Sequence, residues 1–134
     1  MMTWALLLAL AKPPEPLEEI FPQTQLIVDA VVVEVTKEDP PDASGHARQS
    51  LILEVTRCVR GALPTESRTV PGVRPRLTVV NPTYRVKVGI HGPWLLHVDD
   101  KTGARTVLGR YGPDTWTLEQ INAKLTALDP PQLR

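Results

Sequence analysis

QLIVDAVVVEVTK, residues 25–37, is the strongest β-strand signal in the chain. The stretch is rich in valine, and both of its alternating faces are largely apolar. One face carries Ile27, Val31, Val33 and Val35, and the other carries Leu26, Val28, Ala30 and Val32. A strand that buries both faces lies in the centre of a sheet or bends around the corner of a barrel. Because several shorter strands follow, we expect a barrel in which this strand pairs on both halves.

Residues 49–60 follow with a clean alternation of apolar and polar side chains. The face that we expect in the core carries Leu51, Leu53, Val55 and Val59. Arg57 falls on the same face, so a bulge is expected there. Cys58 is the single cysteine, which excludes an internal disulfide, and we expect it to be packed or half-buried.

Shorter strands separated by turns fill the middle of the chain. The pattern predicts strands over residues 68–70, 76–81, 83–88, 94–99 and 104–109. A turn with two glycines is expected at residues 89–93, and a hairpin loop at residues 99–103. Within the strand 83–88, Tyr84, Val86 and Val88 are expected on one face, opposite Arg85 and Lys87.

Helical signals lie before and after the strands. Residues 17–21 predict one helical turn that Pro22 ends. Near the C-terminus a helix face is formed by Leu118, Ile121, Leu125 and Leu128. Thr117 with Gln120 matches a capping box, and Asp-Pro-Pro at residues 129–131 ends the helix. The expected fold is therefore mainly β, a small antiparallel barrel of five to six strands with one C-terminal α-helix.

The first residues have the shape of a secretory signal peptide. An apolar run at residues 4–10 leads into a small-x-small cleavage site at residues 9–11, although no positive charge precedes the run. We expect residues 1–11 to be a truncated signal peptide, 12–24 a Pro- and Glu-rich lead-in, and 25–134 a single domain. A periplasmic or secreted location follows, with a cytoplasmic one as the alternative. The run is too short to span a bilayer, so we expect no membrane span in the mature chain.

The charges of the chain balance overall but not locally. The chain of 134 residues has 15 basic and 15 acidic ones, which removes the simplest argument for a nucleic-acid or membrane-surface partner. Residues 1–47 hold two basic and eight acidic residues, whereas residues 48–87 hold eight basic and two acidic ones. Either opposite charges face each other across a sheet, or a basic face binds an anionic partner.

No pattern in the sequence predicts a catalytic, metal or cofactor site. His46, His91 and His97 are scattered, whereas a zinc site needs three or four converging ligands. A metal site made by His97 with Asp99 and joined by His91 is geometrically possible, but the spacing of these residues is not specific to metal sites. Neither a Gly-x-Ser-x-Gly nucleophile motif nor a phosphate-binding glycine loop occurs in the sequence. We therefore expect a protein that is not an enzyme and that holds no cofactor.

Four segments in order resemble small exported bacterial OB-fold proteins that are similar to the netrin-like domain of metalloproteinase inhibitors. They are the strand at residues 26–35, LILEVTRCVRG at 51–61, VGIHGPWLLHV at 88–98 and LGRYGPD at 108–114. The resemblance covers residues 17–128 and implies an OB-like barrel. The inhibitors reach a catalytic zinc with a cysteine-led N-terminus. Because this chain has no cysteine there, the resemblance does not imply protease inhibition.

Two groups of residues are candidates for binding. The candidate interaction face comprises Arg57, Arg60, Arg74, Arg76, Tyr84, Arg85 and Lys87, and the candidate aromatic patch comprises Tyr111 and Trp116. The alternative for the two rings is that they cover the barrel end where the helix docks. We expect a non-catalytic exported module that binds another protein or an envelope component.

The alternative function is binding of a polyanion or a single-stranded nucleic acid through residues 48–87. Single-strand binding also needs aromatic stacking platforms. Aromatic residues make up only 4% of this chain, so nucleic acid is the less expected partner.

Overall fold

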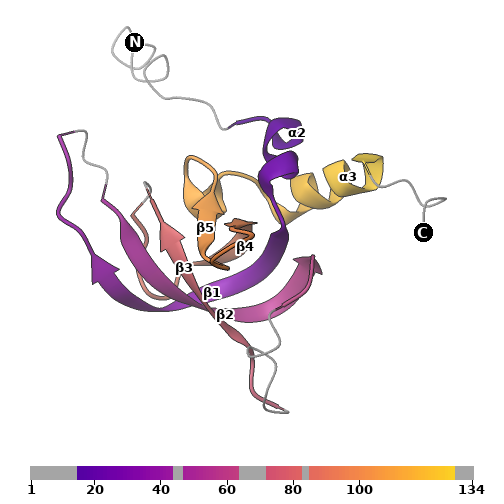
Figure 1. Cartoon of the computed structure of the whole chain (residues 1–134). Helices are drawn as coiled ribbons and strands as arrows, with labels where there is room; N and C mark the ends of the chain where they lie inside the picture. The colour runs from indigo at the N-terminus through magenta and orange to yellow at the C-terminus, as the bar shows by residue number, and fades with distance from the viewer. Residues whose placement is uncertain (1–14, 44–46, 64–71, 83–84, 129–134) are drawn as a thin grey trace, which may run out of the picture.

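The computed structural model describes residues 15–43, 47–63, 72–82 and 85–128, and its five strands close into a barrel (Figure 1). The strands are β1 (Leu26–Glu38), β2 (Gln49–Arg60), β3 (Arg76–Asn81), β4 (His91–Val98) and β5 (Arg105–Leu108). The helices are α2 (Leu17–Ile20), η1 (Phe21–Gln23), η3 (Gly112–Asp114) and α3 (Leu118–Leu128). The order around the barrel is β1-β2-β3-β5-β4, and β4 pairs back to β1. The expected mainly β barrel with a C-terminal helix is confirmed.

β1 bends through the barrel and pairs on both sides, as expected. It pairs with β2 from Ile27 to Glu38 and with β4 from Leu26 to Val31, antiparallel in both cases. Register shifts interrupt the β1–β2 ladder at several points. Such bulges increase the local twist, which a strand needs in order to follow a small barrel.

The two apolar faces of β1 belong to two separate hydrophobic clusters. The inner cluster fills the barrel, and the outer cluster joins the outside of the barrel to α2 and α3. The inner cluster receives Leu26, Val28, Ala30 and Val32 from β1, all of them buried. Ile27 enters the outer cluster. Val35, expected on the face of Ile27, packs against the inner cluster instead, because the bulges change the alternation.

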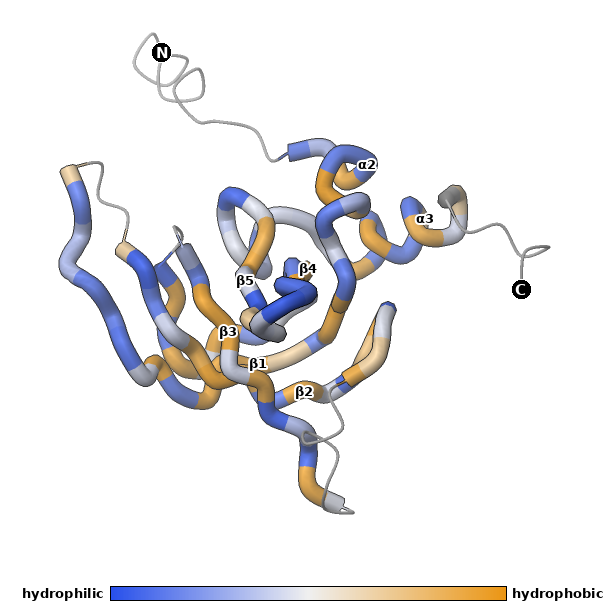
Figure 2. Tube along the Cα trace, in the orientation of Figure 1, coloured by the Kyte–Doolittle hydropathy of each residue, from blue (hydrophilic) through white to orange (hydrophobic). Residues whose placement is uncertain are grey.

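The hydropathy of the strands agrees with this division. Figure 2 shows hydrophobic stretches along β1, β2 and β3 where they enclose the barrel, and on α2 and α3. The buried side chains with the largest volumes include Trp94 and Leu96 in the inner cluster and Ile121 in the outer one. The short N-terminal helix and the C-terminal helix therefore close one side of the barrel together.

One pair of neighbouring strands is parallel, which corrects the expectation of an antiparallel barrel. β3 and β5 run in the same direction, with Val80 opposite Thr106. The other neighbouring strands are antiparallel. A closed ring with an odd number of strands cannot alternate in direction all the way round, so one parallel pair is unavoidable.

β2 spans the expected residues, but its C-terminal end departs from simple alternation. The inner cluster receives Leu51, Leu53 and Val55. The expected bulge near Arg57 is confirmed, because the register shifts between Asp29 and Ala30 of the partner strand. Beyond the bulge, two expectations are wrong: Val59 packs against the outer cluster, and Cys58 is exposed. A further register shift, between Ile27 and Val28, breaks the alternation on which both expectations depended.

The other strands follow the predicted pattern with shifted ends. β3 has the predicted bounds, with Leu77 and Val79 buried. β4 begins at His91, earlier than predicted, so Gly92 and Pro93 belong to the strand and not to a turn. The hairpin loop at residues 99–103 and the strand that follows it are confirmed. The strand predicted over residues 68–70 lies outside the described residues.

The segment predicted as strand 83–88 is not a strand where the structure describes it. Residues 85–87 have no regular secondary structure, and a turn follows at Val88 and Gly89. Val86 is buried, but both of its backbone groups bond to the side chain of Gln49. A side-chain amide thus takes the place of the neighbouring strand that the prediction assumed.

α3 begins with the predicted capping box. The Thr117 N–H donates to Gln120 Oε1 (2.8 Å), and the Gln120 N–H donates to Thr117 Oγ1 (3.1 Å). Ile121 is buried in the outer cluster and Leu125 packs against it, which confirms the predicted face at these positions. The predicted end of the helix at residues 129–131 lies outside the described residues.

The segment expected as a lead-in contributes to the folded domain. Leu17, Ile20 and Phe21 are buried in the outer cluster. The predicted helical turn is α2, which ends at Ile20, and the chain continues into η1, where Pro22 stands in the first turn and no backbone N–H is needed. No helix in the part of the chain that the structure describes is long and apolar enough to cross a membrane.

Candidate functional site

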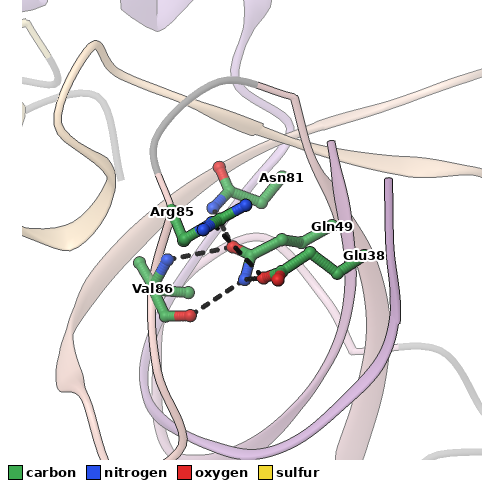
Figure 3. Close-up of polar contacts among 5 residues, drawn as sticks. All are labelled: Glu38, Gln49, Asn81, Arg85 and Val86. Atoms are coloured by element: carbon green, nitrogen blue, oxygen red, sulfur yellow. Dashed lines mark hydrogen bonds and ion pairs between the residues drawn. The ribbon is translucent and has the colours of Figure 1, made fainter. Parts of the chain in front are cut away.

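The side chain of Gln49 is buried at one end of the barrel, with only 1% of its surface exposed (Figure 3). Its Nε2 donates to Glu38 Oε1 (2.7 Å) and to the Val86 carbonyl (2.9 Å). Its Oε1 accepts from the Val86 N–H (2.9 Å) and from Asn81 Nδ2 (3.1 Å). Both donor hydrogens and both lone pairs of the amide are thereby used. We call this arrangement the Gln49 clasp.

The clasp holds one side of a short turn, residues 87–90, which we call the tip. The Ile90 N–H donates to the Lys87 carbonyl (3.2 Å) and closes the turn. On β1, the Val32 carbonyl accepts from the Gly89 N–H (2.8 Å), and the Val32 N–H donates to the Ile90 carbonyl (2.9 Å). Gly89 has a φ of +96°, which favours glycine at the third position of a turn. The tip is therefore fixed both by β1 and by the clasp.

The tip presents aliphatic and basic side chains to solvent. Val88 is 61% exposed and Ile90 is 37% exposed, and Lys87 is exposed next to them. A small pocket of about 200 Å³ lies at the base of the tip, with Asp114 of η3 in its lining. Large aliphatic side chains exposed on a fixed turn are suited to contact with a partner.

The candidate interaction face is divided into two groups. The first group comprises Arg57 and Arg60 in the C-terminal end of β2, Arg74 just before β3, and Arg76 at its start. The second group comprises Arg85 and Lys87, which lie beyond the end of β3, and Tyr84 lies outside the described residues. β3 has six residues, so the two groups are about 17 Å apart along the strand.

Acidic neighbours offset part of the positive charge in both groups. Arg76 Nη2 lies 3.4 Å from Glu54 Oε2, and Arg85 Nε lies 3.5 Å from Glu38 Oε1. In the β1–β2 ladder, Arg57 lies opposite Asp29. The ion pair of Arg85 joins the basic middle of the chain to its acidic first part, and the pairing of β1 with β2 places Arg57 next to Asp29 of the same acidic part. At these positions the opposite charges face each other, as the first interpretation of the charge pattern expects.

The candidate aromatic patch is not an exposed patch. Trp116 is buried, with 8% of its surface exposed, and its Nε1 donates to the Glu15 carbonyl (2.9 Å). Tyr111 is half-buried. Gly109 allows the indole to approach, because a Cβ at that position would lie 2.9 Å from Trp116 Cζ3. The position of Trp116 agrees with the alternative expectation, that the ring covers the barrel where the helix docks.

A groove of about 620 Å³ lies between α2 and α3, over Trp116. Its lining comprises Glu15, Pro16, Leu17, Glu18, Trp116, Gln120, Ala123, Lys124 and Ala127. Lys124 Nζ lies 3.3 Å from Glu18 Oε2 and joins the two helices. The pKa of the Glu18 carboxyl is lowered from its ordinary value, first by a backbone hydrogen bond and then by Lys124. The Glu18 carboxylate therefore remains ionised at neutral pH.

His91 and His97 do not form a metal site with Asp99, the arrangement that the sequence alone allowed. His91 Nε2 lies 3.2 Å from Asp29 Oδ1, and His97 Nδ1 lies 2.9 Å from the Gln23 carbonyl oxygen. Since His91 and His97 lie at opposite ends of β4, His91 does not join a pair of His97 with Asp99. Within the described ranges, no group of three or more His, Cys, Asp or Glu residues is placed to hold a metal ion.

Sequence reasoning missed the clasp and the exposure of the tip. One signal in the sequence could have revealed the clasp. Gln49 lies two residues before Leu51 on β2 and Asn81 two residues after Val79 on β3, so both polar residues occupy positions that point into the barrel. A polar residue at an apolar phase of a strand predicts a buried side chain with hydrogen-bond partners. The tip had no such signal, because residues 83–88 alternate like a strand.

The chain matches no family model, and no curated protein is significantly similar to it.

Proposed function

We propose that this chain is an exported, non-catalytic binding module that contacts another protein or an envelope component through its tip. The observation that carries the proposal is the exposure of Val88 on a turn that the clasp and β1 both hold. In the free protein these aliphatic side chains are in contact with water, which is less favourable than burial. A partner that covers Val88 and Ile90 restores this burial.

The fixed geometry of the tip supports the same proposal. Binding costs less conformational entropy when the contacting segment is already held in its bound shape. In this protein the shape is held by a buried amide, which is favourable only when all of its hydrogen bonds are made. The Gln49 amide meets this condition, so the turn is preorganised.

Polyanion binding through residues 48–87 is the weaker alternative. A polyanion needs a continuous positive surface, whereas the two basic groups lie apart and Glu54 and Glu38 offset Arg76 and Arg85. Charge reversal at Arg74, Arg76 and Arg85 should therefore leave retention on heparin and on oligonucleotide columns unchanged. A large loss of retention would favour the polyanion alternative over the tip.

Site-specific photocrosslinking in the cells that make the protein tests the tip. A photoreactive amino acid at position 88 should give discrete adducts, and one at position 101 should give none. Lys101 is a matched control, because it is exposed in the hairpin loop at the far end of β4. The adducts at position 88 should disappear with Ile90→Asp and persist with Lys87→Met. Equal adducts at both positions, or none at position 88, contradict the proposal.

Export is tested separately by N-terminal sequencing of the protein recovered from its native cells. Cleavage after the small-x-small site predicts a mature chain that starts at Lys12 and is found outside the cytoplasm. An intact Met1 on cytoplasmic protein contradicts export but leaves the crosslinking test of the tip valid.

A further inference from the structure

The groove between α2 and α3 has no role in the proposed function and shares no lining residue with the pocket at the base of the tip. It is larger than that pocket, at about 620 Å³ against about 200 Å³. Trp116 and Leu17 supply buried apolar surface at its base. The only polar atom of the indole already donates to the Glu15 carbonyl, so the ring has no hydrogen bond left to offer a ligand.

α3 contributes a second face to this groove, next to the face that it buries. The buried face carries Ile121 and Leu125. The groove face carries Gln120, Ala123, Lys124 and Ala127, spaced as neighbours on one side of a helix. Ala123 and Ala127 are exposed and have short side chains, which allow another helix to approach closely. From residue 120 to residue 127 the helix rises about 10 Å, or two turns.

The rim of the groove is negative. Glu15 and Glu18 stand on the side of α2, and among the residues that the structure describes Lys124 is the one basic residue in the lining. The ion pair with Glu18 offsets the charge of Lys124, so Glu15, whose Oε1 accepts from the Arg110 N–H (3.1 Å), gives the described part of the lining an excess of one negative charge. A basic ligand is favoured by this charge, and an acidic one is disfavoured.

We propose that the groove between α2 and α3 binds an amphipathic helix of a partner protein, with basic residues flanking the apolar face of that helix. Its apolar side chains cover Trp116, Ala123 and Ala127, and its basic side chains lie near Glu15 and Glu18. This mode is helix-in-groove recognition, in which apolar side chains three and four residues apart anchor the bound helix. The inference goes beyond the tip and does not depend on it.

The test uses the full chain and two labelled model peptides of about four helical turns. Both peptides carry leucine along one face, with lysine on the flanks of one peptide and glutamate on the flanks of the other. Fluorescence anisotropy should show binding of the leucine–lysine peptide and about tenfold weaker binding of the leucine–glutamate peptide. Ala127→Arg, which fills the groove and adds positive charge, should weaken the first peptide about tenfold.

Thr126→Arg is the matched control, because Thr126 is exposed on α3 but does not line the groove. It adds the same charge and should leave the affinity unchanged. Equal affinity for both peptides, no binding, or equal effects of the two arginine variants would overturn the inference. Self-association of the chain that Ala127→Arg abolishes, measured by sedimentation velocity, would instead assign the groove to a second copy. Crosslinking at position 88 is measured in a separate experiment. A negative peptide-binding result for the groove therefore does not contradict the proposal for the tip.

Discussion

The two ends of this domain are held by different forces. At the end with the tip, a buried amide holds a segment without regular secondary structure through four directed hydrogen bonds. At the helical end, α2 and α3 are held by the apolar outer cluster around Ile121 and Trp116. The hydrogen bonds of the clasp all depend on the side chain of Gln49, whereas the packing of the outer cluster is shared among many side chains. The tip is therefore more easily lost through a single substitution than the packing of the helices is.

The largest effect is expected from Gln49→Leu. The variant keeps the volume but removes the partners of the Val86 N–H and C=O in a buried place, so the free energy of unfolding should fall by about 4 kcal/mol. Urea denaturation measures this change, and Gln23→Leu, at an exposed position, should change it little. Crosslinking from position 88 should also weaken in the variant, since the tip loses its clasp.

A smaller effect is expected from Ile121→Ala at the helical end. Ile121 is fully buried in the outer cluster, and its truncation should lower the free energy of unfolding by about 3 kcal/mol. Crosslinking from position 88 should remain unchanged, because the clasp does not involve α3. If Ile121→Ala weakened the tip as much as Gln49→Leu does, the division between the two ends would be wrong.

Removal of the helix cap should have a modest effect. Thr117→Ala removes the acceptor of the Gln120 N–H and should lower the free energy of unfolding by about 1 kcal/mol. Thr126→Ala, later in the same helix, controls for the loss of a threonine. Protection of the first amides of α3 in hydrogen exchange should fall in Thr117→Ala alone. A uniform loss over the whole barrel would show that the cap supports more than the helix.

The smallest effect is expected from pH at the hairpin loop. Backbone hydrogen bonds from Thr102 and then Lys101 lower the pKa of Asp99 below its ordinary value of 3.8. A lowered pKa in the folded state stabilises the protein above the unfolded pKa, and this stabilisation is lost as the pH falls through the folded pKa. Stability should therefore fall on acidification below about pH 4, and less so in Asp99→Asn. Identical pH profiles would exclude a contribution from this turn.

Much of the barrel could be predicted from the sequence, because its strands follow hydrophobic alternation. β2 and β3 have the predicted bounds, and the two apolar faces of β1 correctly indicated a barrel. The capping box correctly marked the start of α3. Such features are local, so a single sequence contains the information needed to find them.

The errors arose where distant residues decide the local structure. Residues 85–87 alternate like a strand, but Gln49, far away in the sequence, supplies their hydrogen bonds. The bulges of β1 and β2 depend on how two strands pair, so the faces of Val35, Cys58 and Val59 could not be read from one strand. The groove forms only where α2 and α3 pack together, and no local sequence pattern predicts that packing.

The parallel pair of β3 and β5 has a consequence for the way in which the barrel opens. This ladder contains one pair of opposite residues, Val80 and Thr106, whereas β1 and β2 pair along almost their whole length. A ring under thermal or mechanical load separates first at its shortest joint, and here that joint is the parallel one. Opened at this joint, the strands would form a twisted sheet in the order β3-β2-β1-β4-β5, with every neighbour antiparallel and β1 at its centre. β1 keeps both of its neighbours, β2 and β4, when the barrel opens at this joint.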